Sequence, residues 1–149
     1  MTEIQLFIQE VFQNQEVVIL QSDEGFAITF SESFMYEDDS PLEVICFWSS
    51  AQKAKEAQHA RWQQHKIKTI SLNDYIEQWL IGMIEEVVLV GINLDAKGKG
   101  EEALPVDFLL DMCNYGIQNY PTFSLKHFKT LEALRQEIIK FKEESNFNQ

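Results

Sequence analysis

Apolar side chains recur near the start of the chain with the spacing of a helix. They occupy every third or fourth position, as Ile4, Phe7, Ile8, Val11 and Phe12. Residues three and four apart share one face of an α-helix, so the pattern predicts an amphipathic helix with one buried stripe. Thr2 stands where a hydroxyl side chain can cap the first turn of that helix.

Other segments have the β-branched or continuous apolar composition of strands. They are residues 16–21, 25–30, 43–48, 67–70 and 87–92. The first two flank Asp23-Glu24-Gly25, which predicts a hairpin because glycine accepts the positive φ of a tight turn. Residues 43–48 are almost wholly apolar, as in a strand buried on both faces. The polar, acidic residues 31–41 predict a surface loop, and 101–104 predict a returning strand.

Helical spacing returns in four later segments, each with a start signal. Their starts are Ser50 before 51–65, Ser71 before 72–84, Pro105 at the head of 105–115 and Thr130 before 131–142. Strand pairs lie next to each other in sequence, and no regular alternation of strand and helix is present. The sequence therefore predicts an α+β fold: a mixed, mostly antiparallel sheet of about four to six strands with helices packed on it. Its length predicts one domain over residues 1–149.

The net charge of −12 indicates which kinds of partner the protein can bind. Repulsion on this scale argues against nucleic acid and anionic membrane as partners. No stretch has the length and apolar character of a membrane span, and residues 1–10 lack the pattern of a signal peptide. The expected location is therefore the cytoplasm.

The charge is unevenly distributed along the chain. Residues 1–52 hold ten acidic residues and neither lysine nor arginine, whereas five of the next sixteen residues are basic. We interpret residues 53–68 as an exposed helix face paired with nearby carboxylates. The candidate interaction surface is formed by Asp23, Glu24, Glu37, Asp38 and Asp39. It would attract a basic protein; the alternative is that these acids only confer solubility.

No motif predicts catalysis, a cofactor or a metal, so we assign no residue to any of these roles. Cys46 and Cys113 lie in apolar runs and are interpreted as core residues. The glycine-bearing segment 91–100 superficially resembles a phosphate loop, but Gly100 follows Lys99 where a serine or threonine is needed. We favour a hairpin turn there. Three tryptophans are expected to anchor the core rather than stack on a ligand: Trp48, Trp62 and Trp79.

A set of features in fixed order resembles a known family. In the first half of the chain, an acidic-glycine hairpin at 23–25 precedes an aromatic-Trp pair at 47–48, and Trp62 follows. The second half continues with an I-x-L segment at 70–72, a W-L pair at 79–80 and a V-G pair at 90–91. A glycine turn and Pro105 complete the order. This order resembles the bacterial family called domain of unknown function 2750. The resemblance covers about residues 17–111, with a helical extension at about 120–146. It implies a small bacterial cytoplasmic α+β domain and transfers no catalytic residue.

Three functional hypotheses follow from these observations. The first is a non-enzymatic protein-interaction domain with an acidic surface, present as a monomer or a homodimer. The second is an immunity-type protein that masks a basic toxin. The third is a small-molecule enzyme that uses carboxylates in a surface cleft. A deep polar pocket with carboxylates of raised pKa would favour the enzyme, and a shallow, acidic, partly apolar surface would favour the binder.

Overall fold

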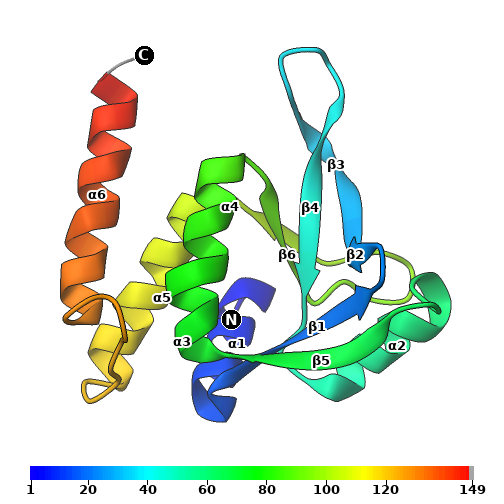
Figure 1. The fold of residues 1–149 in the computed structure, drawn as a ribbon, viewed down its shortest axis with the longest axis horizontal. Coiled ribbons are helices and arrows are strands. Elements are labelled where there is room, and N and C mark those ends of the chain that lie inside the picture. The colour runs from blue at the N-terminus through cyan, green and yellow to red at the C-terminus, as the bar shows by residue number, and fades with distance from the viewer. Residues whose placement is uncertain (148–149) are drawn as a thin grey trace.

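The computed structural model describes residues 1–147 and has the expected α+β architecture (Figure 1). The helices are α1 (Glu3–Asn14), α2 (Ala51–Arg61), α3 (Leu72–Asp74), the π-helical turn η1 (Tyr75–Trp79), α4 (Leu80–Glu86), α5 (Pro105–Asn119) and α6 (Leu131–Phe147). The strands are β1 (Glu16–Ser22), β2 (Gly25–Phe26), β3 (Ile28–Met35), β4 (Pro41–Phe47), β5 (Lys66–Ser71), β6 (Leu89–Ile92) and β7 (Glu101–Ala103). Because α3, η1 and α4 follow one another without a break, residues 72–86 act as one helix.

The strands are divided between two sheets rather than assembled in the single sheet that the sequence predicted. One has the order β2-β1-β5 and is antiparallel, and the other has the order β3-β4-β6-β7. Only the β4–β6 pair is parallel in the described part of the chain. The expected hairpin turn at 91–100 is confirmed, because it joins β6 to the antiparallel strand β7.

Ala27 connects the two sheets. Its amide donates to the Leu20 carbonyl of β1, and its carbonyl accepts from the Cys46 amide of β4, both at 3.0 Å. A second junction lies between Val18 and Trp48, whose backbones exchange two hydrogen bonds. The sheets therefore curl into each other around a small core. Its buried residues are Val18, Leu20, Ala27, Leu42, Val44, Cys46, Trp48, Ala54, Ala57, Trp62, Leu89 and Leu94.

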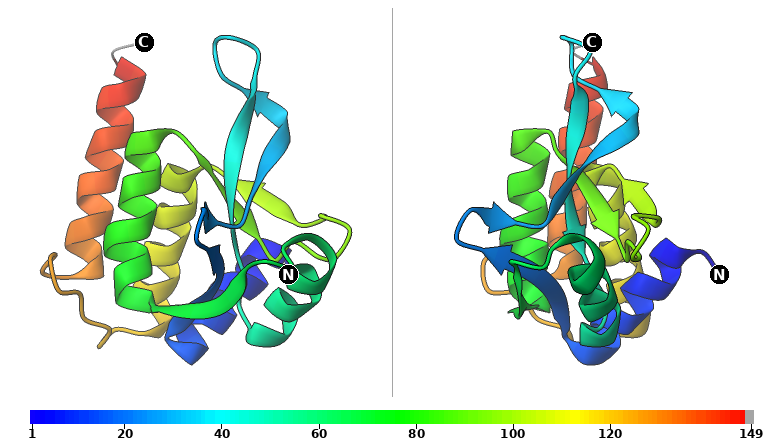
Figure 2. Two further views of the ribbon diagram at one scale, coloured as in Figure 1. Left: turned by 45° about the vertical axis from the view of Figure 1, so that its right-hand side comes forward. Right: turned by 90° about the vertical axis from the view of Figure 1, so that its right-hand side faces the viewer.

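The prediction of a surface loop at 31–41 was wrong. β3 continues to Met35, only residues 36–40 form a turn, and β4 begins at Pro41. The strand is irregular, because its register with β4 shifts between Phe30 and Met35. At this point the Ser31 hydroxyl accepts hydrogen bonds from the amides of Ser33 and Phe34. These local hydrogen bonds stabilise a bulge, so the polar segment stays in the strand. We call residues 28–47 the arm; its free end projects beyond the body in every view (Figures 1 and 2).

A larger core lies where the helices pack on the sheets. Its fully buried aromatic side chains include Phe7, Phe12, Phe47, Tyr75 and Phe108. The predicted stripe of the first helix is confirmed in its buried part, with Thr2 and Gln5 forming the capping box. The helix at 51–65 ends earlier than predicted, at Arg61, and the helix at 105–115 continues to Asn119. Thr130 caps α6 through the Ala133 amide, as expected.

Glu77 fastens the segment between α5 and α6 to the body. Its side chain lies in the π-helical turn and is only 6% exposed. The carboxylate accepts from the backbone amides of Lys126, His127 and Phe128 at 2.8–3.2 Å. A buried carboxylate needs such donors to replace the water it has lost. The expected C-terminal extension is therefore held by an interaction whose acceptor lies far earlier in the chain.

The tryptophans do not share one core. Trp48 and Trp62 are buried and pack edge to face at 5.6 Å in the smaller core. Trp79 is only half-buried and contacts the larger core from outside. The tryptophans therefore anchor the cores as expected, with Trp48 and Trp62 inside the smaller core and Trp79 at the edge of the larger one.

Trp48→Ala should destabilise the fold by about 3–5 kcal/mol, because it opens a cavity and removes the indole donor of the Leu94 carbonyl. Trp79→Ala should cost roughly half as much, since water already covers part of that side chain. Urea unfolding with both variants measures the difference. Equal losses for the two variants would show that Trp79 is as deeply buried as Trp48.

Glu77→Gln should lower the unfolding free energy by about 1.5–3 kcal/mol, because one neutral amide oxygen replaces the two charged carboxylate oxygens. Hydrogen exchange at the amides of residues 126–128 should accelerate more than elsewhere. Glu85→Gln, at an exposed position about two helix turns away, is the matched control. Exchange at 126–128 that stays as slow as in the parent protein would contradict this role for Glu77.

Candidate interaction surface

The five acidic residues singled out from the sequence lie in two places. Asp23 and Glu24 form the β1–β2 turn, whereas Glu37, Asp38 and Asp39 occupy the turn at the tip of the arm. The eight residues of β3 separate the two turns, and a strand of that length spans about 25 Å. Figure 1 shows the two turns at different ends of the arm. The structure therefore does not bring the five acids into one cluster.

The β1–β2 turn lies beside positive charge. Asp23 and Glu24 line a hollow of about 430 Å³ together with Arg61, Trp62 and His65. The Arg61 guanidinium lies 5.3 Å from the centre of the Trp62 ring, a cation–π geometry. The interpretation of 53–68 as a basic face next to carboxylates fits this corner. Its potential is partly neutralised, so it contributes little to a negative surface.

The tip of the arm has no such compensation nearby in sequence. Asp38 accepts hydrogen bonds from the hydroxyl and the amide of Ser40, which lower the pKa of its carboxyl. Asp39 has a φ of 67°, a turn conformation that aspartate tolerates. Within residues 1–147 the ion pairs join Lys53 to Glu10, Lys126 to Asp74 and Lys142 to Asp107, and none involves the arm. The tip therefore carries free negative charge.

One face of the arm exposes apolar side chains nearer its base. Ile28 is 39% exposed and Phe30 is 54% exposed. In the antiparallel register Ile28 lies opposite Ile45, and Phe30 lies opposite Glu43. Directly opposite residues point to the same face of a sheet. Isoleucine and phenylalanine are therefore exposed to water on this face, with a carboxylate beside them.

This face continues into a hollow between the arm and α4. It has a volume of about 320 Å³. We call it the arm groove, and its lining residues are Phe26, Ile45, Gln78, Trp79, Gly82, Met83 and Glu86. Trp79 forms its floor by packing edge to face against Phe26 at 4.7 Å and Phe47 at 5.8 Å. Glu86 is exposed on the rim, and the lining includes no basic residue. The arm groove is shallow and apolar, with acidic surroundings.

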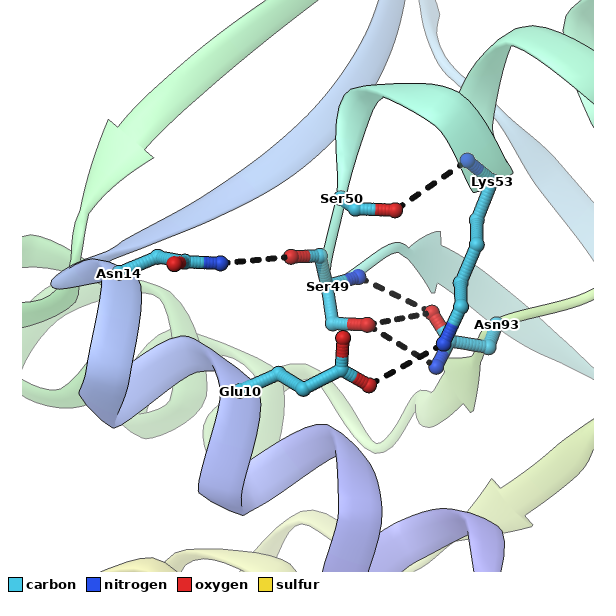
Figure 3. A network of polar contacts seen from close by, with 6 residues as sticks. All are labelled: Glu10, Asn14, Ser49, Ser50, Lys53 and Asn93. Carbon is cyan, nitrogen blue, oxygen red and sulfur yellow. Dashed lines mark hydrogen bonds and ion pairs between the residues drawn. The ribbon is translucent and has the colours of Figure 1, made fainter.

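A polar cluster forms where the parallel strands β4 and β6 end (Figure 3). Ligands often bind at such strand ends in open α/β sheets. Here the Asn93 side chain accepts from the Ser49 amide at 2.9 Å and donates to the Ser49 hydroxyl at 3.2 Å. Asn14 donates to the Ser49 carbonyl, and Lys53 pairs with Glu10 at 3.1 Å. These groups satisfy one another, so the cluster ties α1 and α2 to the end of β6.

Groups suited to covalent or acid–base chemistry are poorly placed. Burial raises the pKa of both thiols to about 12, so Cys46 and Cys113 stay protonated near neutral pH. Partial desolvation and the nearby Asp107 raise the pKa of Asp111, but its side chain is exposed beside an open hollow between α1 and α5. His65 follows the end of α2 and is half-buried. Among the described residues no group of three potential ligands could hold a metal.

The sequence named the acids at the arm tip but missed the apolar half of this surface. Phe26, Ile28 and Phe30 alternate with smaller or polar residues, as expected for a strand with one buried face. That pattern predicts which side chains share a face, but not whether that face is buried. The available signal was the acidic residues on both sides, Asp23–Glu24 and Glu32, which are unusual flanks for a core strand.

No helix in residues 1–147 combines the length and the apolar character needed to cross a membrane.

Comparison with known proteins gives a family and no function. Neither the curated proteins nor the solved structures include a match to this chain. A family model described as "Protein of unknown function (DUF2750)" matches residues 4–112, well over half of the chain. The match includes α1, which the resemblance at 17–111 left out, and it contains the whole arm and arm groove but not α6. The chain therefore belongs to the DUF2750 family of proteins of unknown function.

Proposed function

We propose that this protein is a non-enzymatic protein-interaction domain that binds a basic protein through its arm. The observation that carries the proposal is the combination of exposed apolar side chains and uncompensated acids on one projecting element. Beyond Ile28 and Phe30, the arm also exposes Phe34 and Met35. A partner that covered these side chains would gain about 25 cal/mol for each Å² of apolar surface removed from water.

The acids and the apolar residues have separate roles in this proposal. Carboxylates at the tip attract a cationic surface over distance and raise the association rate. Apolar contacts form only after docking and therefore set mainly the dissociation rate. The enzyme hypothesis lacks comparable support, because the thiols are buried and Asp111 stands alone in an open hollow. An immunity-type protein would be one member of the proposed class.

Charge removal at the arm tip tests the proposal. The variant Glu37→Gln/Asp38→Asn/Asp39→Asn keeps an acceptor at each position, so the turn bond from Ser40 to residue 38 can persist. Association with the partner recovered from the native cell should slow several-fold at low salt. The two proteins should converge at 1 M salt, where the Debye length is about 3 Å. The dissociation rate should change little.

The matched control removes three charges elsewhere, with Glu56→Gln, Glu132→Gln and Glu137→Gln on exposed positions of α2 and α6. Stopped-flow mixing measures both triple variants against the parent protein. If both variants slow association equally, net charge rather than the arm attracts the partner. A rate that the arm variant leaves unchanged, or a partner that is itself acidic, would contradict the proposed function.

A further inference from the structure

We infer that the arm groove receives one large apolar side chain of the partner, flanked by lysine or arginine residues that pair with Glu43 and Glu86. This inference rests on the proposed function and specifies the chemistry of the partner segment. Three independent features of the groove support it: a glycine that the fold does not need, an apolar floor of limited size, and an acidic rim.

Gly82 lies in the middle of the helix 72–86, where glycine lowers helix stability relative to alanine. Its backbone is not in the left-handed region, so no turn requires it. A Cβ built on Gly82 would meet nothing within 4 Å. The contrast with Gly116 is clear, because a Cβ there would lie 2.5 Å from Leu131. The folded chain alone therefore gives no reason for glycine at position 82, and its missing side chain deepens the arm groove.

The size of the groove limits what can occupy it. Its volume of about 320 Å³ is at the lower end of ligand pockets, which span roughly 300–1,000 Å³. The side chains of Trp79, Phe26 and Ile45 together offer apolar contact inside the groove. These dimensions suit one aromatic or aliphatic side chain presented by a protein surface.

The charges around the groove define the flanks of that side chain. Glu43 stands on the arm opposite Phe30, and Glu86 lies on the helix wall. Both are exposed, and neither forms an ion pair within residues 1–147. A second copy of this chain, which itself carries a charge of −12, fits this rim poorly. A segment with lysine or arginine on both sides of the apolar residue fits it well.

The arm favours recognition by side chains over addition of a strand. β3 lies at the edge of its sheet, where an extended segment could in principle pair with it. However, the register shift between Phe30 and Met35 interrupts the regular ladder of backbone groups. Bulges of this kind oppose edge-to-edge pairing. The partner segment is therefore recognised mainly in the groove.

Short labelled peptides test the predicted chemistry on the full chain. The probe is fluorescein-labelled Lys-Lys-Phe-Lys-Lys, with Lys-Lys-Ser-Lys-Lys and Glu-Glu-Phe-Glu-Glu as controls. In fluorescence anisotropy at low salt, the first peptide should bind saturably and at least tenfold more tightly than either control. Equal affinities for the phenylalanine and serine peptides, or no saturable binding of the first peptide at millimolar protein, would overturn the inference.

Gly82→Ala separates binding from folding. The added methyl group narrows the groove at its helix side, so the affinity for the phenylalanine peptide should fall at least fivefold. The thermal midpoint should stay the same or rise, because alanine favours the helix. Gln118→Ala, on an exposed position of α5, is the control and should leave the affinity unchanged. An unchanged affinity in Gly82→Ala would overturn the inference.

The two proposals fail in different ways. If Gly82→Ala leaves the affinity for the native partner unchanged while the tip variant slows its association, the groove inference is wrong and the proposed function stands. If the groove variant weakens peptide binding but the tip variant leaves association with the partner unchanged, the proposed role of the tip is wrong. Self-association in sedimentation that Gly82→Ala abolishes would show a second copy in the groove and overturn the inference.

Discussion

The arrangement of the molecule depends on Ala27, whose backbone forms hydrogen bonds to both sheets. This residue donates to one sheet and accepts from the other, so the chain must leave β1 and join β4 at this point. Its side chain is fully buried in the small core, where a larger residue would have to displace well-packed neighbours. The bend directs β3 away from the body. Past Ile28 the strand pairs with β4 alone in the described structure, and the arm projects as a result.

The exposed surface follows from that geometry. The small core beneath the four-stranded sheet ends near Leu42, so the outer half of the arm has no thick apolar layer behind it. On its other face, Tyr75 and Trp79 of the π-helical turn cover Phe47, whereas Ile28 and Phe30 stay exposed. In the proposed function, stability and binding place opposite demands on this region. A glycine at position 82 lowers helix stability relative to alanine and deepens the groove.

Local signals explain why much of the fold could be predicted from the sequence. Each of four helices begins with a hydroxyl group that accepts a hydrogen bond from a backbone amide three residues later; these residues are Thr2, Ser50, Ser71 and Thr130. The start of such a helix therefore depends only on residues close in sequence. The division into two sheets could not be predicted, because it depends on pairing between residues far apart in sequence. Ala27 shows this limit: nothing in its neighbours indicates that its two backbone groups bond to different sheets.

The candidate surface was only half predictable for a related reason. The acids at the arm tip are visible in the sequence as an unbroken run, Glu37 to Asp39. The exposure of the apolar residues depends on how far the arm projects from the body. The spacing of apolar residues in the sequence does not predict that distance. Trp79 lies on the expected face of its helix, yet coverage by the arm decides its exposure. The role of Glu77 could not be predicted either, because the amides that donate to its carboxylate lie about fifty residues later in the chain.

The central claim is that a partner contacts the face of the arm that borders the groove. Site-specific photo-crosslinking in the native cell tests it directly, with the photoreactive residue placed at Phe30 or, as a control, at Gln118. The account predicts that position 30 captures one protein and that the crosslinked peptide contains an apolar residue next to lysine or arginine. Capture of the same protein with equal yield from position 118, or a crosslinked peptide that is acidic, would contradict it.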